Sequence, residues 1–282
     1  MPTPSRIALA NAYLRAAHQL IDPEPRLLDD PVAVPLLGPA APEQIQAATA
    51  RYRSPEALAL RSHVMLRTRY TEDRLARAVE RGCRQYLVLG AGFETFAYRQ
   101  PAWASALSIV EVDAPAAQEV KRRMLAALGL ADPPNLRFAD IDLGREPLKA
   151  GLARHHIPTD TPTFVSWLGL SMYLEQPAVD EILRTVAACP AGSELVMTFA
   201  WPLGSGLDQD GSAGSTPASR SARAGEPWVT FFMPPALEQY LRDLGFSRVR
   251  FLTPAEADEQ YFAGRPGDLP APRTATIVAA IR

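Results

Sequence analysis

The chain has 282 residues, 47% of them hydrophobic and 21% charged, which suits one large globular domain or a domain with a cap. Its net charge of −2 gives no electrostatic basis for binding nucleic acid or an anionic membrane. No apolar run approaches the roughly 18 to 20 residues that cross a bilayer, and polar residues interrupt the start where a signal peptide would be apolar. Cys83 and Cys189 are too few and too far apart for a disulfide framework or a zinc site. We therefore expect a soluble cytoplasmic protein with reduced thiols.

Residues 1–75 predict an N-terminal helical cap, because they contain no strand pattern. Residues 3–20 have the apolar spacing of an amphipathic helix. Ser54, followed by a proline and an acid, is a strong helix start. That helix should run to about Arg81, and Gly82 can adopt the left-handed conformation that ends helices.

Residues 76–282 predict an α/β domain, because short apolar strands alternate with helices. Residues 193–201 form the longest apolar run and are expected to be central. Residues 204–227 are rich in Gly, Ser and Ala and predict a flexible loop. Seven strands, with a loose connection before the last two, suggest a parallel sheet with an antiparallel final strand. The strands are expected at 85–89, 107–112, 135–143, 163–170, 193–201, 247–252 and 275–281, and the helices between them at 115–128, 146–155, 177–188 and 234–244.

The first of these strands ends in a Gly-x-Gly turn, Gly90-Ala91-Gly92. The second strand ends about twenty residues later in a carboxylate, Asp113. A doubly wound sheet holds an adenosine with this arrangement, since glycines let the backbone approach a ligand and the acid accepts ribose hydroxyls. Two simpler interpretations stay open: the glycines can form only a tight turn, and Asp113 can cap the helix that begins at Pro115.

Five stretches in order resemble S-adenosylmethionine-dependent O-methyltransferases related to leucine carboxyl methyltransferase, in their bacterial branch. The resemblance implies a class I methyltransferase fold: a doubly wound, Rossmann-like seven-stranded sheet with the last strand antiparallel and an N-terminal helical cap. It covers most of the chain outside 204–227. The stretches are DDP (29–31), LRTR (66–69), LGAGFETFAYR (89–99), VEVDAP (110–115) and SWLGLSMYL (166–174).

The resemblance also implies roles for particular residues in binding S-adenosylmethionine, with S-adenosylhomocysteine as the product. Gly90, Ala91 and Gly92 would pass beneath the methionine and ribose, and Asp113 would bind the ribose hydroxyls. Asp142 and Leu143 would hold the adenine, and Arg67 would pair with the methionine carboxylate. No strand-end cluster of Asp and Asn indicates a magnesium-dependent type, so no metal is expected.

The chain departs from the family pattern at the end of the fourth strand and at two residues of the first loop. Trp167 and Leu168 stand where leucine carboxyl methyltransferases carry a Glu, which argues against a protein C-terminus as substrate. Glu94 replaces an Asp and Phe96 replaces a common Arg, so the side-chain contacts of the first loop are not predicted. The methyl acceptor is expected to be an oxygen of a small molecule, and the oligomeric state stays open.

Three residues are candidates for a base or for the substrate pocket: His18, His63 and Tyr173. A carboxylate acceptor has a reference pKa near 4 and needs no base to ionise it at neutral pH. A phenol has a reference pKa near 10 and needs a base. The lack of a convincing base favours a carboxylate slightly. The adjacent His155 and His156 point in different directions with no acid placed nearby, which favours a surface position.

Three other functions compete with this interpretation. Methylation of a protein C-terminal carboxyl group is the first. A nicotinamide-dependent oxidoreductase would need a third glycine at position 95, where Thr95 stands. A non-catalytic protein that binds adenosylmethionine is the third alternative, and the presence of Arg67, Asp113 and Asp142 argues against it.

Overall fold

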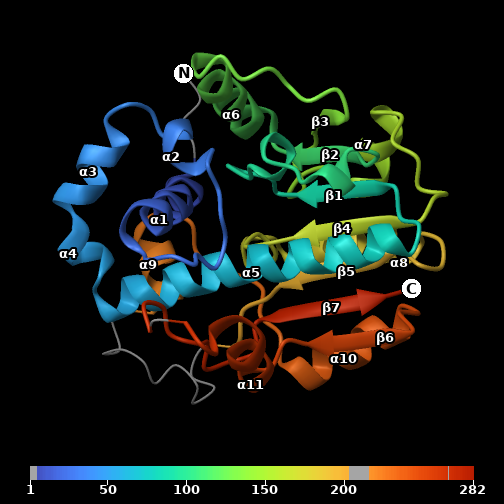
Figure 1. Cartoon of the computed structure of the whole chain (residues 1–282). Helices are drawn as coiled ribbons and strands as arrows, with labels where there is room; N and C mark the ends of the chain where they lie inside the picture. Colours follow the sequence, from blue (N-terminus) through green and yellow to red (C-terminus); the bar gives the residue numbers. More distant parts are fainter. Residues whose placement is uncertain (1–4, 203–215, 266) are drawn as a thin grey trace.

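The computed structural model describes residues 5–202, 216–265 and 267–282, which form a seven-stranded sheet flanked by helices (Figure 1). The strand order is β3-β2-β1-β4-β5-β7-β6, and β7 alone runs antiparallel to its neighbours. The predicted fold class is therefore confirmed, although β4 and not β5 is the middle strand. The strands are β1 (Gln85–Leu89), β2 (Ser108–Asp113), β3 (Leu136–Asp140), β4 (Thr163–Trp167), β5 (Glu194–Thr198), β6 (Arg248–Phe251) and β7 (Ile277–Ile281).

Helices cover both faces of the sheet, which explains why its central strands are buried along their whole length. Alternate residues of each strand enter two separate cores: Tyr86 and Val88 pack toward α5, whereas Leu87 and Leu89 pack toward α7, α8 and α10. The helices of the sheet region are α6 (Pro115–Ala127), α7 (Leu148–Arg154), α8 (Gln176–Ala187), α9 (Pro217–Arg223), α10 (Pro234–Asp243) and α11 (Pro254–Ala257), with the 3₁₀ turns η1 (Phe96–Tyr98), η2 (Ala102–Ala104) and η3 (Ser171–Tyr173) and the π-helical turn η4 (Asp258–Phe262).

The N-terminal region is helical, as the sequence predicts. Its longest helix starts where Ser54 accepts a hydrogen bond from the Ala57 amide, and Gly82 follows its end with φ of 99°. This helix continues past residue 75, the predicted boundary of the cap, so a single helix connects the N-terminal helices to the sheet (Figure 1). The five helices of this region are α1 (Arg6–Ile21), α2 (Ala33–Leu36), α3 (Ala41–Ala47), α4 (Thr49–Tyr52) and α5 (Pro55–Glu80).

The described part of the segment 204–227 differs from the flexible loop that the composition of the segment predicts. Residues 203–215 lie outside the described residues, but 217–223 form helix α9. Thr216 caps this helix by accepting a hydrogen bond from the Ser219 amide at 3.2 Å. Ser221 is buried, and its hydroxyl lies 2.8 Å from that of Tyr173. A local cap and a distant side-chain contact thus order a stretch that has few apolar residues of its own.

Candidate functional site

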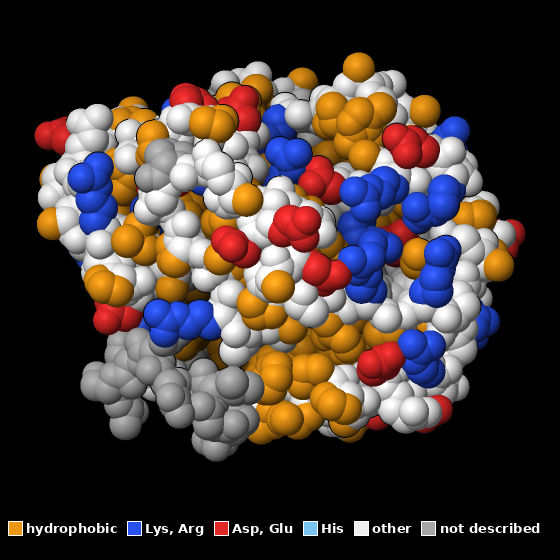
Figure 2. Space-filling model, turned by 60° about the horizontal axis from the view of Figure 1, so that its bottom comes forward, with side chains coloured by type: hydrophobic (Ala, Val, Ile, Leu, Met, Phe, Trp, Pro, Cys, Tyr) orange, Lys and Arg blue, Asp and Glu red, His pale blue; other side chains and the backbone are white. Residues whose placement is uncertain are grey.

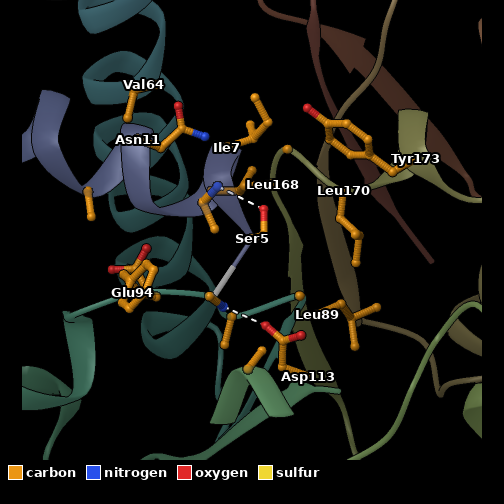
Figure 3. A pocket seen from close by; sticks show the side chains of 18 of the residues that line it. Ser5, Ile7, Asn11, Val64, Leu89, Glu94, Asp113, Leu168, Leu170 and Tyr173 are labelled. Atoms are coloured by element: carbon orange, nitrogen blue, oxygen red, sulfur yellow. Dashed lines mark hydrogen bonds between the residues drawn. The ribbon is translucent and has the colours of Figure 1, made fainter. Parts of the chain in front are cut away.

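A cavity of about 460 Å³ lies at the carboxyl ends of β1, β2 and β4, beneath the N-terminal end of α1 (Figure 3). The chain leaves β1 toward β2 on one side and later returns to place β4 on the other side. Doubly wound sheets bind their ligands at such a switch point. The walls come from α1, α5, the loop after β1, the end of β2, the segment after β4, and residues 226–229.

The glycine turn forms the floor of this cavity. The Gly90 and Ala91 amides both donate to the Val112 carbonyl, at 2.8 and 3.1 Å, which ties the turn to β2. Gly90 and Gly92 have φ of 66° and 48°, a conformation that side chains other than glycine rarely adopt. A Cβ on Gly90 would lie 2.5 Å from Cδ2 of Leu170. This close approach explains why the turn requires glycine and leaves its backbone open to a ligand.

Asp113 lies at the end of β2 and lines the cavity. Its Oδ2 accepts the Gly92 amide and its Oδ1 accepts the Ala114 amide, both at 2.7 Å. Burial raises the pKa of Asp113, against the lowering effect of these two hydrogen bonds. The residue does not cap α6, whose capping position is Ala114. Each carboxylate oxygen keeps a lone pair, so Asp113 can still accept hydrogen bonds from a ligand.

Arg67 projects from α5 into the same cavity. Its guanidinium lies over Gly169, where Nη1 would be only 2.6 Å from an added Cβ. Burial and the neighbouring Arg15 lower the pKa of Arg67 to about 10, so the side chain stays charged at neutral pH. It forms no ion pair or side-chain hydrogen bond with any described residue. A buried guanidinium that forms no ion pair with the described residues is suited to an anionic ligand group.

A buried ionic network lies beside the cavity. Arg15 donates two hydrogen bonds of 3.0 Å to Glu94 and one of 2.9 Å to Asp30. Although burial alone would raise it, the pKa of Glu94 is held well below its usual range, mainly by Arg15. Thr95, at the position of the missing third glycine, donates to Asp30 at 2.6 Å. Glu94, which replaces the shorter Asp of the family pattern, is thus held by Arg15. Phe96, which replaces a common Arg, packs edge-on against the Tyr86 ring, with 5.6 Å between the ring centroids.

Asp142 and Leu143 follow β3, the neighbour of β2, but they are not among the residues that line the cavity. Asp142 is partly exposed, and its Oδ1 accepts the Gly144 amide at 3.1 Å. Leu143 is buried in the core between the sheet and α7. Their contact with adenine stays a prediction.

The structure does not bring the two candidate histidines to the cavity wall. Both ring nitrogens of His18 are engaged: Nδ1 lies 2.7 Å from Oδ2 of Asp22, and Nε2 accepts the Leu28 amide at 3.3 Å. His63 has its pKa lowered to about 3 by burial and by Arg67, so its imidazole is neutral and a poor base.

Tyr173 is the one of the three candidates that lines the cavity, and its hydroxyl is hydrogen-bonded to Ser221. Neither His155 nor His156 lines the cavity; His156 is exposed, as predicted, whereas His155 is only partly exposed. However, His155 has an acid partner that the sequence did not indicate, because its Nε2 lies 2.6 Å from Oδ1 of Asp140.

The cavity has wall residues that sequence reasoning missed. Asn11 faces it from α1, and Leu170 from the segment after β4 (Figure 3). Glu226 also lines the cavity, and it accepts hydrogen bonds from the Ser5 hydroxyl at 2.6 Å and the Arg6 amide at 2.9 Å, which ties it to the start of α1. No local motif marks these residues. Only the capping signal of Ser5 at the start of α1 was available in the sequence.

Within the described residues, no helix is long and apolar enough to cross a membrane. The same part of the chain has no group of three or more His, Cys, Asp or Glu side chains placed to hold a metal ion.

Known proteins resemble this chain along most of its length. The profile of the leucine carboxyl methyltransferase family matches residues 8–187. A putative S-adenosyl-L-methionine-dependent methyltransferase of Bacillus subtilis is 27% identical and covers 77% of this chain and 72% of its own length. A protein of the same description from Mycolicibacterium paratuberculosis is 31% identical, over 67% of this chain and 72% of its own.

Solved structures with similar folds have low sequence identity. A putative methyltransferase from Thermobifida fusca superposes with a TM-score of 0.54 at 21% identity, covering 100% of this chain and 96% of its own. A DUF574 family protein from Streptomyces avermitilis superposes with a TM-score of 0.51 at 17% identity, covering 95% of this chain and 96% of its own. The profile match and the 31% relative establish that this chain belongs to the leucine carboxyl methyltransferase family of S-adenosylmethionine-dependent methyltransferases.

Proposed function

We propose that this protein transfers the methyl group of S-adenosylmethionine to a carboxylate oxygen of a small molecule, releasing S-adenosylhomocysteine and a methyl ester. The observation that carries the proposal is the convergence of Arg67, the Gly90–Gly92 turn and Asp113 on one cavity. Membership in a methyltransferase family supports the same reaction class.

The cavity residues fit the cofactor. The unpaired Arg67 fork suits the methionine carboxylate, and the free lone pairs of Asp113 suit the ribose diol. The glycine turn removes side chains from the path between them. When bound, the cofactor supplies an activated methyl group, so the main tasks of the protein are to align the acceptor and to exclude water.

The lining residues favour an acceptor that is already ionised. No histidine is among the described residues that line the cavity, Glu94 is held by Arg15, and the Tyr173 hydroxyl is bonded to Ser221. A carboxylate, with a reference pKa of about 4, needs no base at neutral pH. A phenol, with a reference pKa of about 10, would need one.

The apolar side chains in the cavity lining favour a small, largely apolar acceptor. Ile7, Leu168, Leu170 and Val229 are among the residues that line the cavity. Leu168 stands at one of the two positions where the family's protein methyltransferases carry a Glu, and an apolar wall there cannot replace that carboxylate. This supports a small-molecule acceptor over the C-terminus of a protein.

The test uses radiolabelled S-adenosylmethionine with pairs of aromatic acids and phenols that share one ring scaffold. We expect the acids to become labelled as methyl esters, from which mild alkali releases the label as methanol. A methyl ether of a phenol would keep its label, because mild alkali does not hydrolyse ethers. Arg67→Gln should abolish most of this transfer, whereas Arg69→Gln, the same change on the same helix outside the cavity, should not. Alkali-stable label on the phenols alone would overturn the carboxylate assignment. No binding of S-adenosylhomocysteine by the folded protein would overturn the function itself.

A further inference from the structure

A second hollow, of about 360 Å³, lies on the other side of α5 from the cofactor cavity. Helix residues are about 100° apart, so Arg67 and Arg69 point in nearly opposite directions, one into each space. Arg69 lies on one face of α5 with Asp73 and Arg77, each four residues from the next. We call this second space the arginine hollow; it is lined by Arg26, Leu27, Arg69, Asp73, Arg77, Gln260, Tyr261 and Arg265.

Positive charge dominates the lining of the arginine hollow, with four guanidinium groups and one carboxylate. That carboxylate, Asp73, is already used, because its two oxygens accept hydrogen bonds of 3.0 Å from Arg69 and from Tyr261. Arg77 forms no ion pair or side-chain hydrogen bond with any described residue. Several Lys and Arg side chains gather on this face of the molecule (Figure 2).

Two of the arginines also carry buried donors without an acceptor. Nε of Arg26 and Nε of Arg265 are both buried and make no hydrogen bond with any residue that the structure describes. The Arg265 side chain is only 8% exposed, and its other nitrogens bind Asp268 and the Pro25 carbonyl, each at 2.8 Å. Arg26 pairs with Glu24. Glu24 and Asp268 therefore offset part of the charge but leave these donors free.

We infer that the arginine hollow is a binding site for a phosphate group on a small molecule, separate from the methyl-transfer site. Its donors come from three directions: the segment before α2, the outer face of α5, and the residues after η4. A planar carboxylate presents two oxygens to one side, whereas a tetrahedral phosphate presents acceptors in several directions. Arginine donors that converge from these three directions match the second geometry.

The site can be tested by titrating the full chain with phenyl phosphate and with inorganic phosphate, following heat or intrinsic fluorescence. Saturable binding is expected. Arg77→Gln should weaken it by about tenfold or more, the usual effect of one charge-assisted hydrogen bond. Arg51→Gln, an equal loss of charge at an exposed position of α4, should leave it unchanged. Asp73→Asn should strengthen it, because this change removes the carboxylate that repels the ligand, and a misfolded variant could not give that result.

Two outcomes would overturn the assignment. The first is the absence of saturable binding, or equal affinity in Arg77→Gln and the unaltered chain. The second is binding that is lost in Arg67→Gln and kept in Arg77→Gln, since the ligand would then occupy the cofactor cavity. Circular dichroism of each variant shows that the comparison is made between folded chains.

Discussion

Replacing Gly90 with alanine tests the claim that the turn under the cofactor cavity requires glycine for two separate reasons. The left-handed backbone, with φ of 66°, should cost about 1 to 2 kcal/mol once a Cβ is present. The new Cβ would also lie 2.5 Å from Cδ2 and 3.1 Å from Cβ of Leu170. Rotation of the leucine can relieve only the first contact, because its own Cβ is fixed to the backbone. Such overpacking costs about 1 to 3 kcal/mol, so Gly90→Ala should lower the free energy of unfolding by about 2 to 5 kcal/mol.

Gly82 provides the matched control. Its φ is 99°, and an added Cβ would meet nothing within 4 Å. Gly82→Ala should therefore show the backbone cost alone, about 1 to 2 kcal/mol. Urea unfolding followed by circular dichroism measures both variants, and calorimetry with S-adenosylhomocysteine measures the cofactor site. Only Gly90→Ala should weaken binding, because the displaced Leu170 lines the cavity.

A double variant separates the two contributions further. Leu170→Ala in the Gly90→Ala background removes Cγ and Cδ2 but keeps Cβ, so it should restore the part of the packing loss that comes from Cγ and Cδ2 and none of the backbone cost. The reasoning is refuted if Gly90→Ala and Gly82→Ala are equally destabilised, or if the second change restores nothing.

Three further predictions concern the site and its surroundings. Asp113→Ala should weaken S-adenosylhomocysteine binding by about 1 to 3 kcal/mol in calorimetry; unchanged affinity would mean that the acid only holds the glycine turn. Glu226→Gln should destabilise the chain by about 0.5 to 2 kcal/mol, as loss of a helix cap does, and should speed release of S-adenosylhomocysteine in stopped flow; an unchanged release rate would contradict a role of this contact in retaining the ligand. The pKa of His63 is lowered to about 3 from its unfolded value of 6.5, so protonation favours the unfolded chain. As the pH falls from 6.5 toward 3, the free energy of unfolding should therefore decrease by up to about 1.4 kcal/mol per pH unit. His63→Gln should flatten that slope, and an equal slope in both chains would contradict it.

Most of the fold could be predicted from the sequence because its signals are local. Strands β1 and β4 are short apolar runs that end in a glycine or an abrupt polar change, and each occupies the expected residues within a few positions. The start of α5 depends on one hydroxyl and one proline, and Ser54 caps it as predicted. The antiparallel β7 followed from the broken alternation before it. In each case the deciding residues are close together in the chain.

Elements whose order depends on distant contacts were not predicted. Helix α9 has few apolar residues, and a contact between Ser221 and Tyr173, 48 residues apart, holds it in place. The acid partner of His155 is Asp140, which lies at the end of β3, whereas His155 directly follows α7. Composition describes what a segment lacks, but it does not show which neighbour will supply the missing interactions.

The same division applies to the candidate site. The glycine turn and Asp113 belong to strand ends and could be identified from spacing, since parallel strands bring their carboxyl ends to one edge. Residue pattern alone did not separate Arg67 from the other arginines of α5, and only the family resemblance singled it out. The structure places Arg67 at the cavity and Arg69 at the arginine hollow. The cavity wall joins Ser5 to Glu226, 221 residues away in the chain. Beside the arginine hollow, Arg265 binds the carbonyl of Pro25, 240 residues away. Cofactor binding depends on local backbone geometry, whereas acceptor choice depends on side chains from elements far apart in sequence. The acceptor therefore has to be sought from the shape and charge of the folded cavity.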